Sequence, residues 1–92
     1  MKHYYKLTLP NNNFDIFFSS IDKTKKTVTF MVATKEGKVM PNPETNQKET
    51  TMPYLLENNM FTVLGLIQVS SNLFVDIDNI LNGSDELKQN VV

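Results

Sequence analysis

The sequence contains no cysteine, and this absence excludes several classes of chemistry at once. Disulfide bonds, thiolate zinc sites, iron–sulfur clusters and cysteine nucleophiles all need a side chain that the chain lacks. Glycine is scarce, and the three glycines, Gly37, Gly65 and Gly83, are isolated from one another. Because neither a Gly-x-Gly-x-x-Gly nor a Gly-x-x-x-x-Gly-Lys motif is present, the sequence indicates no nucleotide cofactor. We expect the protein to use no cofactor.

Arginine and tryptophan are also absent, so all nine basic residues are lysine. The planar guanidinium of arginine makes two-point contacts with phosphate and guanine, and nucleic-acid recognition here would depend on lysine charges alone. The abundance of lysine and asparagine is typical of AT-rich coding. It suggests an AT-rich microbe, a phage or a mobile element as the source.

Long apolar runs are missing as well. The most apolar segment, residues 60–69, is about half as long as the roughly 20 residues that a membrane-spanning helix needs. The lysine-containing start of the chain is not followed by the apolar stretch of a signal peptide. The sequence therefore predicts a cytoplasmic protein without a membrane anchor.

The chain length and composition predict one small globular domain. Its 92 residues are 40% apolar and 21% charged, which is ordinary for a soluble domain. We expect a single compact domain over residues 1–92. Residues 41–52 contain almost nothing to bury and are predicted to form an exposed loop, and residues 84–92 are predicted to form a frayed tail.

Three segments of the first third alternate between apolar and polar side chains. Residues 2–9, 14–21 and 27–34 each show the period of two that is typical of a half-buried strand. In the second segment this alternation places Ile21 on the face opposite to Phe18. Polar turn residues separate the segments, so we predict a three-stranded antiparallel meander.

The pattern in the second half is less regular. Residues 53–57 are compatible with one helical turn, since proline is favoured at the first helical positions. Residues 60–69 are apolar on both faces and rich in β-branched side chains, which favours a central strand, with a buried helix as the rival interpretation. Gly65 lies in the middle of this run and would weaken either element.

Residues 73–82 have the spacing of a helix, with Ser71 as the expected cap and Gly83 as the expected stop. One stripe of the predicted helix is apolar: Leu73, Phe74, Ile77, Ile80 and Leu81. Val75 does not fit this stripe, and a hairpin turning at residues 70–72 is the alternative. The predicted fold is therefore α+β, a small antiparallel sheet packed with one helix.

Charge is divided unevenly along the chain. Residues 1–48 hold eight lysines and four acidic residues, a net charge of +4, whereas residues 49–92 hold one lysine and six acidic residues, a net charge of −5. The two halves can neutralise each other by packing together. Alternatively, the split makes a dipolar surface that steers a partner or pairs copies of the chain.

The sequence offers few candidates for catalysis. The single histidine, His3, lies beside the N-terminus and has no obvious partner. Asp76 and Asp78 would project to the same side of a strand and suit a divalent metal, but on a helix they lie about 200° apart. A metal-dependent enzyme using these two aspartates is the weakest of three hypotheses, and we expect neither a metal site nor an enzyme.

The hypothesis that the sequence favours is a non-enzymatic protein-binding module. Its second strand carries large apolar side chains on both faces, and a small sheet cannot easily cover both. The AT-rich coding suggests a phage or mobile-element accessory protein that inhibits a host factor such as a defence system, and a homo-oligomer is also expected. The second hypothesis is a nucleic-acid-associated module that uses a lysine-rich hairpin loop. The candidate partner-binding residues are Phe17, Ile21, Lys23, Lys25, Lys26, Lys35 and Lys38.

Overall fold

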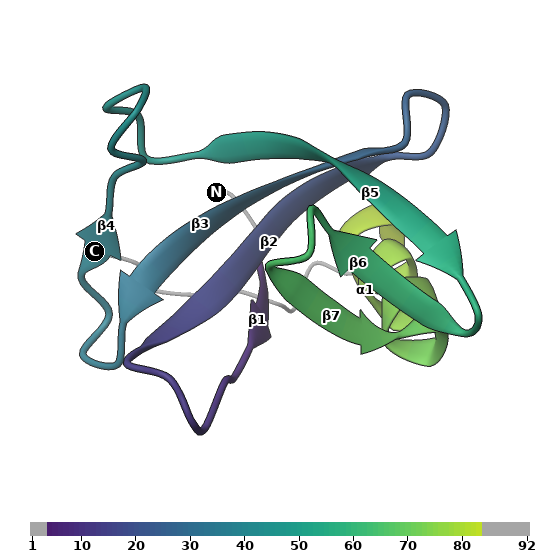
Figure 1. The fold of residues 1–92 in the computed structure, drawn as a ribbon, viewed down its shortest axis with the longest axis horizontal. Helices are drawn as coiled ribbons and strands as arrows, with labels where there is room; N and C mark the ends of the chain where they lie inside the picture. Colours follow the sequence, from purple (N-terminus) through teal and green to yellow (C-terminus); the bar gives the residue numbers. More distant parts are fainter. Residues whose placement is uncertain (1–3, 84–92) are drawn as a thin grey trace.

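The computed structural model describes residues 4–83 and shows a curled antiparallel sheet packed against one helix (Figure 1). The strand order in the sheet is β1-β2-β3-β5-β6-β7, and β4 pairs with β3 along the same edge as β5. The elements are β1 (Tyr5–Leu7), β2 (Phe14–Asp22), β3 (Thr27–Thr34), β4 (Val39–Met40), β5 (Thr50–Glu57), β6 (Met60–Val63), β7 (Ile67–Ser70) and α1 (Ser71–Gly83). The α+β prediction is confirmed.

The predicted N-terminal meander is confirmed as β1, β2 and β3, and one irregularity changes which face a side chain occupies. The β2–β3 register shifts between Phe18 and Ser20, so Ser19 is an extra residue and its hydroxyl donates to the Thr29 carbonyl oxygen at 3.3 Å. A bulge of this kind reverses the alternation beyond it. Ile21 therefore packs against the same core as Phe18, and its predicted position on the opposite face was wrong.

The core fills the concave face of the curled sheet, and α1 closes one end of it. β2 and β3 cross the molecule as long strands, and α1 lies behind β5, β6 and β7 in Figure 1. At the centre the rings of Phe61 and Phe74 stack with their centroids 4.9 Å apart, and Tyr54 lies 5.0 Å from Phe61. The helix is thus fixed to β5 and β6 by large aromatic side chains.

The predicted single strand at 60–69 was wrong, because a tight turn divides this segment into β6 and β7. Leu64 and Gly65 both have positive φ, at 46° and 73°, and the Leu66 amide donates to the Val63 carbonyl oxygen at 2.8 Å. The two strands pair antiparallel and bury alternate side chains against the core. Because the turn residues are apolar, the sequence of this hairpin resembles that of one continuous strand.

Residues 50–57 form β5, so the predicted loop at 41–52 ends at residue 49 and the predicted helical turn at 53–57 was wrong. Pro53 is tolerated because the Tyr54 amide donates toward β3, to the Lys26 carbonyl oxygen at 3.0 Å. Neighbouring residues of a strand direct their amides to opposite sides, so the nitrogen of Pro53 points to the β6 side of β5. The pairing of β5 with β6 ends at Tyr54 and Val63, so β6 has no partner for an amide at Pro53. No ladder hydrogen bond is lost there.

The predicted helix at 73–82 is confirmed as part of α1, and its start differs slightly from the prediction. The Leu73 amide donates to the hydroxyl of Ser70 at 3.3 Å, so Ser70 caps the helix in place of Ser71. Val75, which did not fit the apolar stripe, is 52% exposed. Within the part of the chain that the structure describes, no helix has the length and apolarity needed to cross a bilayer. The predicted tail at 84–92, His3 and the start of the first predicted strand lie outside the described residues.

Candidate functional site

The two apolar candidates for partner binding, Phe17 and Ile21, are covered by the chain itself. Phe17 is 4% exposed and packs with Met31 on the convex face of the sheet. The ring of Tyr4 meets the Phe17 ring edge-on at 6.5 Å, and the Lys6 ammonium lies 5.9 Å from its centroid. Ile21 is half-buried against the main core. Phe17 therefore offers no free surface, and Ile21 offers only part of its side chain.

Three candidate lysines, Lys23, Lys25 and Lys26, lie together at the β2–β3 turn. The carboxylate of Asp22 shapes this turn by accepting hydrogen bonds from the amides of Thr24 and Lys25, both at 3.0 Å. Lys23 is held across the molecule, because its ammonium lies 2.8 Å from a carboxylate oxygen of Asp78 on α1. This hydrogen bond raises the pKa of Lys23. The turn therefore has two lysines, at 25 and 26, that form no ion pair among residues 4–83.

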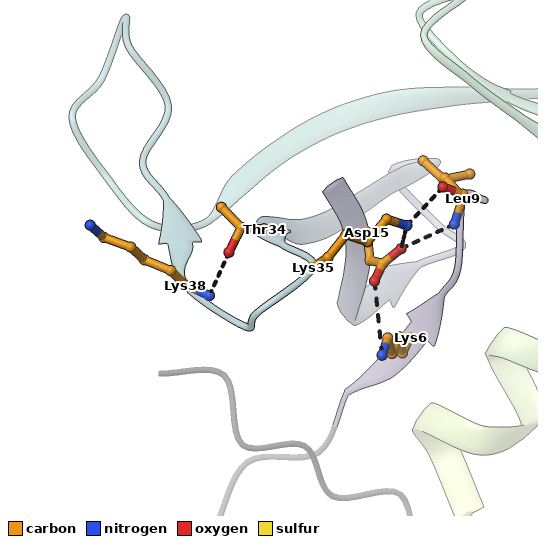
Figure 2. Close-up of polar contacts among 6 residues, drawn as sticks. All are labelled: Lys6, Leu9, Asp15, Thr34, Lys35 and Lys38. Carbon is orange, nitrogen blue, oxygen red and sulfur yellow. Dashed lines mark hydrogen bonds and ion pairs between the residues drawn. The ribbon is translucent and has the colours of Figure 1, made fainter. Parts of the chain in front are cut away.

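The other two candidate lysines, Lys35 and Lys38, lie at the opposite end of β3 (Figure 2). The Lys35 ammonium contacts the buried carboxylate of Asp15 at 2.5 Å and also donates to the Leu9 carbonyl oxygen at 2.8 Å. The side chain of Lys38 extends away from this network. The two lysine clusters are thus separated by the length of β3, and one member of each is engaged within the fold.

Asp15 is the only buried charged residue in the part of the chain that the structure describes, and it is 3% exposed. Besides Lys35, it accepts a hydrogen bond from the Leu9 amide at 3.1 Å, and Lys6 lies 3.8 Å from its second oxygen (Figure 2). The hydrogen bond from Lys35 is the main reason that the pKa of Asp15 is lowered, although burial acts in the opposite direction. Asp15 joins the β1–β2 turn to the β3–β4 turn, and its contacts indicate a structural role.

Asp76 and Asp78 both lie on α1, where a spacing of two residues directs them to different sides of the helix. Asp78 is paired with Lys23, whereas the negative charge of Asp76 contributes, after burial, to the raised pKa of Tyr5. Among residues 4–83, no three acidic, histidine or cysteine side chains gather as a metal site would require. The helix therefore does not bring these two aspartates together.

The open side of the curled sheet holds an apolar cleft that was not predicted. The strand order begins with β1 and ends with β7, and the cleft lies between the β1–β2 turn and the start of β7. We call it the seam cleft. It has a volume of about 400 Å³. None of its lining residues is charged: Leu9, Asn12, Phe14, Ile16, Phe30, Val32, Met40, Leu66, Ile67 and Gln68.

A second hollow of about 370 Å³ continues the seam cleft toward the β4–β5 loop. The two share Phe30, Val32, Met40 and Leu66, so they are continuous with each other, although the lining of the second hollow also includes the charged residues Glu44 and Lys48. A larger hollow of about 460 Å³ lies at the other end of the molecule, beside Lys23 and Asp78. That hollow is open and lined mostly by polar residues, and two of its three charged side chains, Lys23 and Asp78, already pair with each other.

The β6–β7 turn beside the seam cleft presents two leucines to solvent. Leu64 is 58% exposed and Leu66 is 75% exposed. The turn lies within residues 58–75, a run of the sequence without a charged side chain. This surface was not predicted from the sequence, and this uncharged run is the signal that could have found it.

No family model, no curated protein and no solved structure matches this chain. The functional proposal therefore rests on the seam cleft and on the residues that surround it.

Proposed function

We propose that the protein is a non-enzymatic protein-binding module, and that its seam cleft takes an uncharged, extended segment of a partner protein. The observation that carries the proposal is the lining of the cleft, which combines about 400 Å³ of space with ten uncharged residues. Apolar clefts with a few polar groups at the rim are the usual form of a binding site. Here Asn12 and Gln68 supply polar groups of this kind.

The position of the cleft between two strand ends favours an extended segment. Within the described sheet β7 pairs with β6 alone, and β1 pairs with β2 alone. A strand that has one partner presents its other edge for pairing, and peptides often bind by adding a strand to such an edge. β7 carries neither lysine nor proline, so nothing in its sequence discourages pairing.

The same lining disfavours the alternative partners. A nucleic acid needs several positive charges, and the seam cleft has none. The lysine turn at residues 23–26 lies away from the cleft, and Lys23 is paired with Asp78. The suggestion of a phage or mobile-element inhibitor of a host factor depends on coding bias, so we describe the partner by its chemistry.

The proposal is tested with peptides, because the natural partner is not specified. Random peptides of about ten residues, long enough to pair along β7, are selected against the protein by display. The best peptide is then titrated by calorimetry into the wild type, Met40→Glu and Met60→Glu. The two methionines are 39% and 37% exposed, but only Met40 lines the cleft.

We expect Met40→Glu to weaken peptide binding at least about tenfold, because a charge would be placed where an apolar side chain binds. Met60→Glu should leave the affinity unchanged. Equal affinity for all three proteins would contradict the proposal. So would loss of binding when Lys23, Lys25 and Lys26 are all replaced by glutamine, because that result would favour the lysine turn.

A further inference from the structure

The two tight turns of the β5–β6–β7 meander use the same backbone conformation with different residues. Asn58 and Asn59 have φ of 53° and 64° in the β5–β6 turn, and Leu64 and Gly65 have φ of 46° and 73° in the β6–β7 turn. Asparagine and glycine adopt this left-handed conformation readily. Leucine does so at a cost, because its Cβ crowds the backbone. Leu64 is therefore an unfavourable residue for its turn, whereas Asn58, at the equivalent position of the β5–β6 turn, is a favourable one.

Burial within the fold offsets little of this cost. Leu64 is 58% exposed and lies outside the buried core, and Leu66 is 75% exposed. A locally unfavourable residue that stays more than half exposed after folding points to a contact outside the folded chain. We call Leu64, Gly65 and Leu66 the leucine tip.

We propose that a second copy of this chain binds the leucine tip in its seam cleft, and that the two copies exchange tips about a two-fold axis. The proposal rests on the proposed function of the seam cleft and names the partner, with a tight turn of that partner in the cleft in place of an extended segment. Leu66 belongs both to the tip and to the cleft wall, so the tip and the cleft are neighbours on one face. A single two-fold rotation therefore places each tip beside the cleft of the other copy.

Charge and volume agree with this arrangement. The leucine tip and the lining of the seam cleft are both uncharged, so two copies meet here without like-charge repulsion. The cleft volume of about 400 Å³ lies within the range of pockets that enclose small molecules, and a leucine side chain fits such a space. Each copy would bury two leucines that are exposed in the single chain.

The test is sedimentation equilibrium of the full chain from about 1 μM to about 1 mM, a range that resolves weak dimers. Four proteins are compared: the wild type, Leu64→Asn, Leu55→Asn and Asn58→Leu. Leu64→Asn removes the apolar side chain and restores a favourable turn residue. Leu55 is 62% exposed on β5, outside the tip and the cleft, so Leu55→Asn controls for the loss of any exposed leucine.

We expect the wild type to dimerise and Leu64→Asn to raise the dimer dissociation constant about 100-fold, because two buried leucines are lost per dimer. Leu55→Asn and Asn58→Leu should dimerise like the wild type. A wild type that stays monomeric throughout the range overturns the proposal. Equal dissociation constants for the wild type and Leu64→Asn also overturn it, as does equal weakening by Leu55→Asn.

A mixing experiment tests the exchange of tips directly. Leu64→Asn has an intact cleft and a defective tip, and Met40→Glu has an intact tip and a defective cleft. A mixture of the two can form a heterodimer with one intact tip–cleft contact, so it should associate more tightly than either variant alone. Association no tighter than that of the separate variants overturns the exchange. The peptide titration with Met40→Glu tests the proposed function independently, because it needs no dimer.

Discussion

Replacing Asp15 by asparagine removes the one buried charge in the described part of the chain while almost preserving the shape of the side chain. The asparagine oxygen can still accept the hydrogen bond from the Leu9 amide. What is lost is the negative charge that faces Lys35 at 2.5 Å and Lys6 at 3.8 Å. The variant therefore isolates the electrostatic part of the network that joins the β1–β2 turn to the β3–β4 turn.

The expected loss follows from the exposure of the partners. A hydrogen bond to a charged group contributes about 1.5–3 kcal/mol to stability. Lys35 is 37% exposed and Lys6 is 41% exposed, so water screens both contacts. We therefore expect Asp15→Asn to lower the free energy of unfolding by about 1–2 kcal/mol, which for a domain of this size is a fall in Tm of roughly 5–15 °C.

Lys35→Gln should cost at least as much as Asp15→Asn, because it leaves a buried carboxylate without its closest partner. The double variant should be less destabilised than the sum of the two single variants, by about 1 kcal/mol. Urea unfolding of the wild type, the two single variants and the double variant measures these differences in the free energy of unfolding. Asp78→Asn, which affects an ion pair whose Lys23 side chain is 60% exposed, serves as the control and should change the midpoint less. A loss below about 0.5 kcal/mol for Asp15→Asn, the range of ordinary surface substitutions, would refute the reasoning.

Three further predictions concern pH, the leucine tip and the helix cap. Folding lowers the pKa of Asp15 below its ordinary value of 3.8. The ionised carboxylate therefore contributes its full stabilisation above pH 3.8, and this stabilisation is lost as the pH falls through the folded-state pKa. In urea unfolding, the difference in free energy between the wild type and Asp15→Asn should be constant from about pH 7 to 5 and should narrow below about pH 4. In urea titrations at low protein concentration, Leu64→Asn should raise the free energy of unfolding of the monomer by about 1 kcal/mol, and Asn58→Leu should lower it by a similar amount. Equal stability of both variants and the wild type would show that leucine costs nothing at these turn positions. Ser70→Ala should cost about 1 kcal/mol in thermal unfolding followed by circular dichroism, and an unchanged Tm would show that Ser70 is not the cap.

The strands of the first third were predictable because each has one buried face. Alternation in β2 and β3 located both strands nearly to the residue. The bulge at Ser19 was not predictable, because an extra residue in a strand leaves no mark in the alternation until the register with β3 is known. The face occupied by Ile21 could be assigned only from that register.

The second half was harder because one of its tight turns, between β6 and β7, does not have a turn-like sequence. Leu64-Gly65 turns the chain between two apolar strands, where an asparagine pair such as Asn58-Asn59 would have been recognised. Pro53 suggested the start of a helix, although it lies in a strand at a position whose amide would be unpaired. The helix at 71–83 was predictable from its apolar stripe.

The seam cleft depends on two features that were not predicted, the division of residues 60–69 into β6 and β7 and the curl of the sheet. Five lysines were predicted as binding residues from their clustering alone. Sequence spacing placed them correctly at two opposite turns, but the contacts of Lys23 with Asp78 and of Lys35 with Asp15 join residues far apart in the chain. Leu64, Leu66 and Met40 were missed because isolated apolar residues are common on any surface.

The central claim, that the seam cleft binds a segment of another protein chain, is tested most directly by amide NMR of isotope-labelled protein during titration with the selected peptide. We expect the largest chemical-shift changes at residues that line the cleft, in particular Asn12, Met40 and Gln68. The amides of Lys25 and Lys26 should shift little. Changes centred on those two lysines, with the cleft residues unaffected, would contradict the account.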